Sequence, residues 1–339
     1  MQNYSVALAA YNGEKFIKKQ LQSILNQTVK PTEVIITDDC STDKTPQIVE
    51  EFIGVSGLTD WKLYRSDKNV GYRRNFYNAI ERTSAEIIFL CDQDDVWQPQ
   101  KAEKMLDLFQ SNPQALAVNS SFKFINQDDE DISFNKRDGK SNNNLIHQRI
   151  AEKEFVRISV NDIVRYNISP GCTMAIRRKV AMRYLSKTNC AMPHDWELNI
   201  LAAEMDGLYF YNSPLINYRI HQNNTIGMKM QNETIELKMR GSEETRKDVL
   251  YTQTAQADIA LSVGDKLDKK TVKFAAHLKS FCDNRQKIIY EKKFLPCIKN
   301  FWHYLFLRRV ETVHFRGLLG DIVYIGVNIF KRGGDKTNA

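Results

Sequence analysis

The strongest constraint on the fold is a regular alternation of short apolar runs with longer segments whose apolar residues recur at helical spacing. The apolar runs, which have the pattern of buried strands, lie at 5–10, 33–37, 61–65 and 86–91. The helical segments lie at 14–26, 45–52, 72–82 and, opened by Pro99, 99–109. Strands that alternate with helices in this way form a mostly parallel sheet flanked by helices. The first half of the chain is therefore predicted to be a Rossmann-like α/β domain.

Beyond residue 125 the pattern is less regular. A polar segment predicted to be a loop, a helical segment and a strand follow in that order, at 126–144, 196–205 and 208–211. From about 230 the chain is helical and polar as far as 293, and two apolar-aromatic patches follow, at 301–307 and 322–330. We predict one α/β domain over residues 1–229 and a basic helical extension over 230–339.

The positive charge of the chain is concentrated at its C-terminal end. The net charge is +7, and residues 277–339 hold 12 Lys and Arg against 5 Asp and Glu, so the rest of the chain is balanced. A nucleic-acid-binding domain would carry its charge over the folded body, so no nucleic-acid partner is expected. The basic and aromatic tail suits an anionic membrane surface, although helices that pack with a solvated basic face would have the same pattern.

The cysteines and the N-terminus indicate where the protein resides. The six cysteines lie far apart without a C-x-x-C pair, which argues against a zinc site and against a disulfide framework. The first residues lack a basic leader, and no apolar run approaches the ~20 residues of a membrane-spanning helix. We therefore expect a cytoplasmic protein, attached to the membrane only peripherally if at all.

Polar and acidic residues follow three of the predicted strands. They are the loop Ala10–Glu14, the pair Asp38–Asp39 and the run Asp92–Asp95. Ligands of an open parallel sheet bind at the carboxyl ends of its strands, so these segments are expected to meet there. Five carboxylates at one edge would repel one another unless a divalent cation such as Mg²⁺ or Mn²⁺ bridged them to a diphosphate. Turn formation or helix capping is the alternative, which we accept for Asp43 but not for Asp92–Asp95.

Several ordered motifs resemble one enzyme family. The segments SVALAAYNGEKFIKKQLQSILNQT, VIITDDCSTDKT and CDQDDVW are similar to the inverting family-2 glycosyltransferases of the GT-A fold. The segments NVGYRRNF, GCTMAIRR, PHDW and YRIHQNNTIG resemble the rhamnosyltransferase branch of that family. The resemblance covers roughly residues 4–227. It implies a GT-A catalytic domain, with a nucleotide-binding part at about 1–125 and an acceptor-binding part at about 150–229.

The resemblance also implies an activity. An enzyme of this kind moves one sugar from a nucleoside-diphosphate sugar, here dTDP-rhamnose or a UDP-sugar, to a hydroxyl of a glycan or lipid-linked saccharide in cell-surface polysaccharide synthesis. It further implies a nucleotide pocket lined by Tyr11 and Glu14 beside Ala10, in which Asp39 contacts the nucleobase. By the same comparison, Asp94 contacts the ribose or the metal.

Further site residues are implied or suggested around this pocket. The resemblance implies that Asp95 binds the metal. It also suggests that His221 completes the metal shell or meets the diphosphate, where a lone histidine would otherwise be read as structural. Asn69, Arg73 and Arg74 follow the third strand, and an arginine there could pair with the diphosphate, although a solvated helix face is an equal alternative. Gly171 and Cys172 are expected to pass beneath the donor sugar, where a side chain would intrude.

The segment His194-Asp195-Trp196 is the second candidate constellation. Inverting transfer needs one carboxylate to take the acceptor's proton, and Asp195 matches the position of the family's base. His194 and Trp196 are assigned to acceptor binding, since an indole offers an apolar face to a sugar ring. Asp195 is also expected to precede a helix and to serve as its N-cap.

Two rival functions remain open. A sugar-nucleotide pyrophosphorylase would need a Gly-rich, basic loop after the first strand, which Ala10–Phe16 lacks. An inactive transferase-derived binding protein would keep the same motifs. The absence of G-x-G-x-x-G and P-loop motifs after these strands argues against a Rossmann oxidoreductase and a P-loop NTPase.

Overall fold

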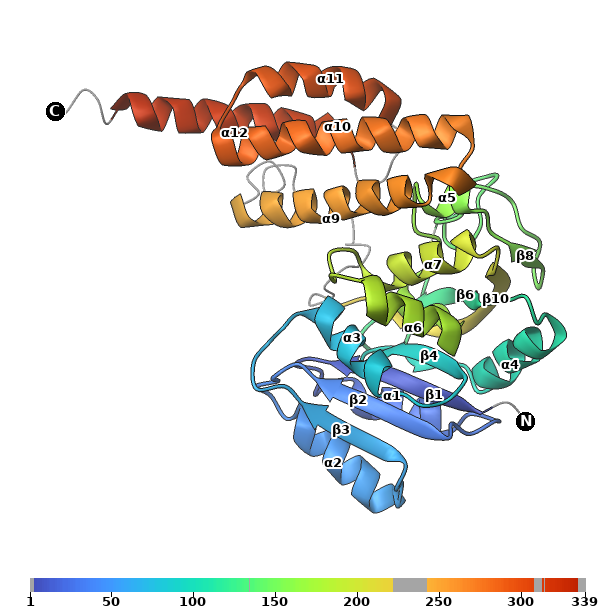
Figure 1. The fold of residues 1–339 in the computed structure, drawn as a ribbon. Coiled ribbons are helices and arrows are strands. Elements are labelled where there is room, and N and C mark those ends of the chain that lie inside the picture. Colours follow the sequence, from blue (N-terminus) through green and yellow to red (C-terminus); the bar gives the residue numbers. More distant parts are fainter. Residues whose placement is uncertain (1–2, 134, 222–242, 308–312, 314, 335–339) are drawn as a thin grey trace. The chain divides into compact units, whose positions relative to one another are not determined.

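The computed structural model describes residues 3–133, 135–221, 243–307, 313 and 315–334 (Figure 1). The chain packs as two compact units. The first contains Met1–Ile163 and Asn167–Lys229, and the second contains Val164–Tyr166 and Met230–Ala339.

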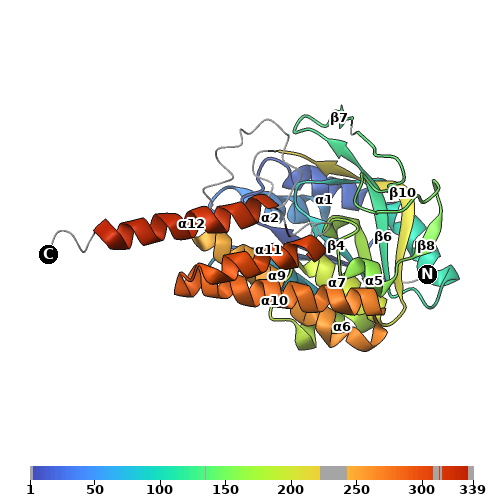
Figure 2. The same cartoon turned by 90° about the horizontal axis from the view of Figure 1, so that it is seen from above.

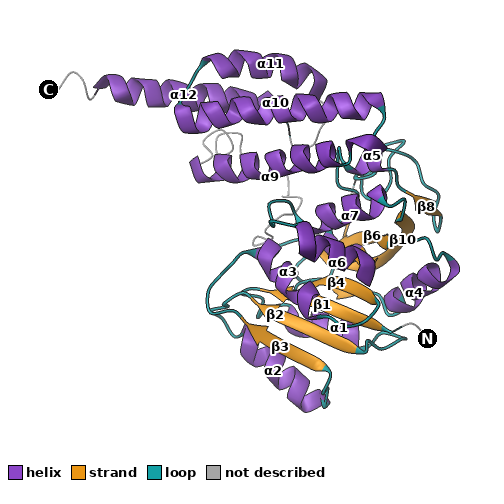
Figure 3. Ribbon diagram, viewed as in Figure 1, coloured by secondary structure: helices purple, strands orange, loops and turns teal. Residues whose placement is uncertain are grey.

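The first unit is built on one mixed, mostly parallel sheet (Figure 3). Its strands are β1 (Tyr4–Ala10), β2 (Glu33–Asp38), β3 (Trp61–Arg65), β4 (Ile87–Asp92), β5 (Val96–Trp97), β6 (Ala117–Ile125), β7 (Asp131–Ile132), β8 (Phe155–Arg157), β9 (Met174–Arg177) and β10 (Leu208–Arg219). The main strand order is β3-β2-β1-β4-β9-β6-β10-β5. The first four strands run parallel, β9 lies antiparallel between β4 and β6, and β6 and β10 are again parallel. The predicted α/β fold is confirmed.

Helices flank this sheet. They are α1 (Ile17–Leu25), α2 (Thr45–Ser56), α3 (Tyr72–Arg82), α4 (Lys101–Ser111), α5 (Val160–Ile163), α6 (Arg178–Lys187) and α7 (His194–Glu204). All seven residues of β1 are buried, and α1 covers the core with Ile17, Leu21 and Ile24, which recur at helical spacing. The continuous apolar runs of the central strands are those of a sheet covered on both faces.

Some predicted boundaries were wrong. Helix α1 begins at Ile17 instead of residue 14, because the Gly13 carbonyl accepts the amides of Phe16 and Ile17 in a preceding turn. Strand β10 has 12 residues and not the four expected, because it continues through shifts in register around Pro214 that interrupt its apolar alternation. The predicted loop 126–144 contains the short strand β7.

The second unit is helical (Figure 2). Its helices are α9 (Glu243–Ser262), α10 (Lys269–Glu291), α11 (Leu295–Leu307) and α12 (Phe315–Gly334), and α10 packs against both α9 and α11. The buried side chain of Arg285 donates to Asp321 and Gln253, which ties α10 to α12 and α9. Among the described residues, every helix is too short or too polar to cross a lipid bilayer.

Candidate active site

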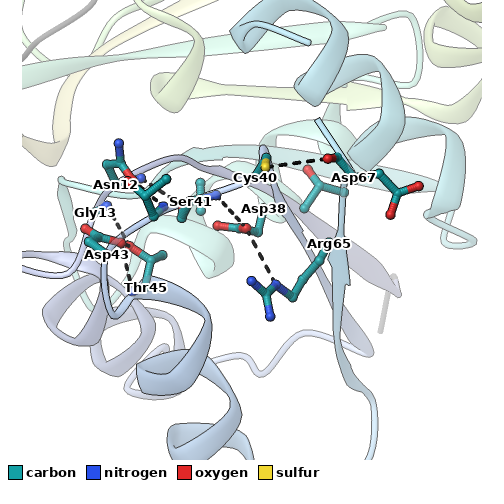
Figure 4. Close-up of polar contacts among 12 residues, drawn as sticks. Asn12, Gly13, Asp38, Cys40, Ser41, Asp43, Thr45, Arg65 and Asp67 are labelled. Atoms are coloured by element: carbon teal, nitrogen blue, oxygen red, sulfur yellow. Dashed lines mark hydrogen bonds and ion pairs between the residues drawn. The ribbon is translucent and has the colours of Figure 1, made fainter. Parts of the chain in front are cut away.

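The loops after β1 and β2 form one hydrogen-bonded surface (Figure 4). The Asn12 amide donates to Ser41 Oγ at 2.8 Å, and the Gly13 amide donates to Thr45 Oγ1 at 2.7 Å. Asp43 Oδ1 accepts the Thr45 amide at 2.9 Å, at the start of α2. The loops at the carboxyl ends of these two strands are therefore fixed against each other.

The residues predicted to line the nucleotide pocket lie on this surface. The Tyr11 ring is 45% exposed, whereas Ala10 is buried and accepts the Asp39 amide through its carbonyl. Glu14 is exposed, and its carboxylate accepts the Lys44 amide at 3.1 Å. Tyr11 and Glu14 are thus accessible to a ligand, and Ala10 can offer only backbone.

Asp39 has a structural task that the sequence did not reveal. Its side chain is buried, and its two oxygens accept the amides of Val70 and Gly71 at 2.7 and 2.8 Å. Asn69 Oδ1 accepts the same Gly71 amide at 3.1 Å. Both side chains therefore shape the start of α3.

The arginines that follow β3 do not share one environment. Arg74 is exposed, and its guanidinium lies 4.0 Å from the centre of the Tyr77 ring on the same helix. This arrangement agrees with the alternative prediction, in which Arg74 lies on a solvated helix face and does not bind the diphosphate. Arg73 donates to the Tyr72 hydroxyl at 3.0 Å, and its charge acts on buried His194.

A single glutamine joins the loop after β1 to the acidic run after β4. The Tyr11 amide donates to Gln93 Oε1 at 2.8 Å, and Gln93 Nε2 donates to the Tyr11 carbonyl at 2.8 Å. A Cβ at Gly13 would lie 2.1 Å from Gln93 Oε1, so any larger residue would push the Gln93 amide out of this position. Gln93 therefore holds Tyr11 beside the acidic run.

The acidic run forms a compact cluster of candidate metal ligands. One ligand atom from each of Asp92, Asp95 and Cys172 lies within 4.8 Å of the others. Asp95 Oδ1 accepts the Arg219 amide at 2.9 Å, while its buried Oδ2 has no N–H or O–H donor among the described residues. Burial and then neighbouring carboxylates raise the pKa of both Asp92 and Asp95, and burial raises the pKa of the Cys172 thiol. A buried carboxylate among like charges, hydrogen-bonded to the Arg219 amide and to the Cys172 thiol, fits a divalent cation.

The other two predicted metal ligands also meet. His221 Nε2 lies 2.8 Å from Asp94 Oδ2, although the two residues are separated by most of the domain's sequence. Asp94 follows β4 and His221 follows β10, so the sheet brings them together. Residues 222–227 of the YRIHQNNTIG motif lie outside the described residues.

Arg219 is a site residue that sequence reasoning missed. Its side chain is fully buried; it donates to the carbonyls of Asp94 and Asn126 at 2.7 and 2.9 Å and pairs with Asp129 at 2.5 Å. Its backbone amide orients Asp95. Arg219 thus fixes the acidic run against the end of β10. The sequence signal that could have identified Arg219 is its place inside the motif YRIHQNNTIG, between Tyr218 and His221.

Arg219→Lys is expected to lower the free energy of unfolding by ~1–3 kcal/mol, because one ammonium cannot satisfy the carbonyls that the planar fork reaches. The Mn²⁺ affinity should fall with it, since Asp94 and Asp95 lose their support. Urea unfolding and Mn²⁺ titration would measure both effects. Arg82→Lys, on the exposed face of α3, is the matched control. A variant that unfolds and binds Mn²⁺ like the wild type would contradict this assignment.

Lys101 is a second residue that the sequence did not indicate. Its ammonium is fully buried at the start of α4, where it donates to the Cys172 carbonyl at 2.6 Å and lies 4.1 Å from the Trp97 ring centre. Burial lowers its pKa to about 8, and the charges of Asp95 and Asp92 are among the groups that oppose this shift. The positive charge of Lys101 partly compensates the negative charges of the acidic cluster.

Asp195 lies buried in the first turn of α7. Its Oδ2 accepts Asn167 Nδ2 at 2.8 Å. Burial raises its pKa to about 6, against hydrogen bonds from the Trp196 amide and from Asn167 that lower it. Asp195 also raises the pKa of Asp92, so the carboxylate is within electrostatic reach of the acidic cluster. The predicted N-cap role was wrong, because α7 begins at His194 and Pro193 is its N-cap.

His194 and Trp196 do not have the environment expected of acceptor ligands. His194 is buried and stacked on Phe76 at 3.7 Å between ring centres, and burial lowers its pKa to about 3. Trp196 is buried and donates through Nε1 to the Ile163 carbonyl at 2.6 Å. A sugar can stack only on an exposed ring, so neither side chain offers the predicted acceptor surface.

Gly171 lies against His194 and Asp195. A Cβ here would lie 2.7 Å from His194 Nε2 and 3.3 Å from Asp195 Cβ. The absence of a side chain thus lets the turn before β9 approach the start of α7. The position of Gly171 beneath a donor sugar stays a prediction.

Known proteins with similar sequences include glycosyltransferases. The chain is 29% identical over 232 residues to dTDP-rhamnosyl transferase RfbG of Shigella flexneri, which covers 65% of this chain and 73% of that protein. It is 27% identical over 236 residues to an uncharacterized glycosyltransferase of Haemophilus influenzae, with 68% and 70% covered.

Solved structures share the fold. The form of S. aureus TarS with residues 1–349 has a TM-score of 0.56 at 16% identity, covering 98% of this chain and 92% of that chain. Mannosyltransferase PcManGT from Pyrobaculum calidifontis, in complex with GDP-Man and Mn²⁺, has a TM-score of 0.52 at 15% identity, covering 96% and 86%.

The family itself follows from the sequence model of glycosyl transferase family 2. This model matches residues 5–185, which is more than half of the chain. The match spans the loops after β1 and β2, the acidic run after β4 and the turn before β9. The chain therefore belongs to glycosyl transferase family 2.

Proposed function

We propose that this glycosyltransferase is inverting and metal-dependent, and that it moves one sugar from a nucleoside-diphosphate sugar to an acceptor hydroxyl in cell-surface polysaccharide synthesis. The observation that carries the proposal is the position of Asp195, a buried carboxylate whose pKa is raised to about 6 and whose charge reaches the acidic cluster. A base and a cation-binding cluster in one site are what inverting transfer requires.

The protein groups proposed for the cation are Asp94, Asp95 and His221, joined by Asp92. Their oxygen and imidazole donors suit Mn²⁺ or Mg²⁺. A cation held there would supply positive charge to the departing diphosphate, which makes a separate protein acid unnecessary. Arg219 and Lys101 act in this scheme as positioning residues, because Arg219 contacts the acidic run and Lys101 contacts the neighbouring Cys172 carbonyl.

Asp195 is proposed as the general base. It takes the proton of the acceptor hydroxyl as that oxygen attacks the anomeric carbon, and the bond from this carbon to the diphosphate oxygen breaks on the opposite face. A raised pKa makes the carboxylate a better proton acceptor near neutral pH than an ordinary aspartate. The same reaction inverts the configuration at the anomeric carbon.

The proposed donor is dTDP-rhamnose or a UDP-sugar. The name of the Shigella relative supports the first, and a TarS complex with UDP-GlcNAc, similar to this chain in fold, supports the second. We assign donor binding to residues of about 1–125, with Tyr11, Glu14 and Asp39 nearest the nucleoside, and acceptor binding to about 150–229. The acceptor is proposed to be a glycan or lipid-linked saccharide at the cytoplasmic face of the membrane, reached through the basic C-terminal unit.

A thermal-shift screen of nucleoside diphosphates and nucleotide sugars, with and without Mn²⁺, would test this function. The matching donor nucleotide at 100 times its Kd should stabilise the fold by ~2.7 kcal/mol, and only when Mn²⁺ is present. Slow Mn²⁺-dependent hydrolysis of the same nucleotide sugar should follow. Stabilisation by a nucleoside triphosphate together with a sugar phosphate would favour a pyrophosphorylase. Binding without hydrolysis or transfer would favour an inactive binding protein.

A further inference from the structure

Helix α11 has a wide apolar face that the described residues leave uncovered. Its buried side, which includes Cys297, Asn300 and Leu307, packs in the helical unit, and Asn300 donates to the Phe281 carbonyl of α10 (Figures 1 and 2). The opposite side carries six exposed apolar side chains, namely Leu295, Ile298, Phe301, Trp302, Leu305 and Phe306. Leu295, Ile298, Trp302 and Leu305 recur at spacings of three and four residues and therefore form one stripe. We call these six residues the α11 face.

The size and composition of the α11 face limit what can cover it. The helix has 13 residues, about 20 Å of length, so it is too short to cross a bilayer. Three of its exposed side chains are aromatic, and Trp302 is 66% exposed. A short helix with a broad apolar face and exposed aromatic rings lies in the plane of a membrane interface.

The charge around the α11 face favours one kind of partner. Helix α11 contains no acidic residue, and its exposed Lys299 lies at the edge of the face. Lys273 of α10 places its ammonium 5.0 Å from the centre of the Phe306 ring. Basic side chains beside an apolar face complement the headgroups of an anionic bilayer. A helix of the same unit that faced only water would not need the exposed apolar and aromatic side chains of the α11 face.

We propose that the α11 face docks onto the surface of an anionic lipid bilayer, with Trp302 at the level of the headgroups. This inference deepens the membrane-side acceptor proposed above and rests on that proposal. Apolar burial supplies the attraction at short range, and the lysines select anionic over neutral lipid. The helix then lies on the membrane and does not span it.

Tryptophan fluorescence offers a site-specific test with the full chain. The protein has four tryptophans, and Trp61, Trp97 and Trp196 are buried, so Trp302 alone is exposed to solvent. Vesicles of phosphatidylglycerol and phosphatidylcholine at low salt should shift the emission to shorter wavelength, and brominated lipid should quench it. Pure phosphatidylcholine vesicles should produce a much smaller change. Trp302→Phe should abolish the signal while co-sedimentation with anionic vesicles persists.

A double variant tests whether vesicle binding depends on the α11 face or on another part of the molecule. Ile298→Glu with Trp302→Glu should weaken co-sedimentation with anionic vesicles by about 100-fold, because two anchors are lost and two like charges are added. Val55→Glu, which replaces an 83% exposed side chain on α2, is the matched control and should bind vesicles normally. The double variant should retain its nucleotide-dependent thermal shift, so a failed docking test does not touch the catalytic proposal.

Three outcomes would overturn the docking proposal. Full-length protein that ignores anionic vesicles at low salt, or that binds neutral and anionic vesicles equally, contradicts an anionic surface. A full-length dimer that the double variant converts to monomer, without vesicle binding by either, would show that a second copy covers the face. Light scattering after size-exclusion chromatography would detect that dimer.

Discussion

Asp195→Asn is expected to lose sugar transfer by ~10²–10⁴-fold while its fold and donor affinity remain, because an amide cannot take a proton at neutral pH. The amide has nearly the same shape, and its oxygen can still accept the Asn167 side chain that now donates to Asp195. Transfer to a defined acceptor, measured with a nucleotide thermal shift on the same sample, separates catalysis from binding.

The pH dependence of sugar transfer by the wild-type enzyme should also reflect the pKa of Asp195. The base works when it is deprotonated, and burial raises the pKa of Asp195 to about 6. The value of kcat/KM should therefore be constant above this pH and fall about tenfold per unit below it. An ordinary aspartate would keep the rate constant down to about pH 4.

Glu197→Gln is the matched control for Asp195→Asn. It also removes one buried carboxylate from the first turn of α7, but its partner is the Thr188 hydroxyl at 2.7 Å. Near-normal transfer in Glu197→Gln beside a strong loss in Asp195→Asn identifies the base. The opposite result would move that role to Glu197.

Asp95→Asn is expected to abolish turnover and to lower Mn²⁺ affinity by more than ~100-fold, because it removes one charge from the buried ligand cluster. Its effect on the metal-free fold should be small or even favourable. Burial beside other carboxylates raises the pKa of Asp95, so the ionised form is disfavoured in the native state without a cation. The measurements are Mn²⁺ titration and melting temperature with and without nucleotide.

Asp131→Asn, an exposed acidic residue of β7 in the same unit, is the control for Asp95→Asn. It changes the net charge equally and should leave Mn²⁺ binding and turnover unchanged. Full activity of Asp95→Asn, or of the wild-type enzyme in excess EDTA, would refute the metal hypothesis.

The sequence predicted those parts of the site that depend on strand ends. Parallel β1, β2 and β4 each begin and end at the same level, so the polar residues that follow them had to share one edge of the sheet. The meeting of Asp94 with His221 came from the family resemblance, because only a long-range pairing of β10 brings His221 there.

The sequence could not predict the surroundings of α7. Its first ten residues, His194 to Ala203, are all buried, so no polar face marks which side chains are accessible. His194 and Trp196 therefore looked like ligands although they are core residues. Lys101 and Arg219 were overlooked for the converse reason: long cations are rarely buried, and only tertiary contacts with main-chain carbonyls make these two stable.

The contact between Gly13 and Gln93 has an evolutionary consequence. A methyl group at position 13 would collide with the side-chain amide of Gln93, so a side chain can appear there only if that amide moves aside or residue 93 changes. Because Gln93 also pairs with both backbone groups of Tyr11, a change at residue 93 alone would release the loop after β1. A substitution at one of the two positions is therefore expected to disturb the other. A joint change of residues 13 and 93 in related sequences would mark a rebuilt loop after β1.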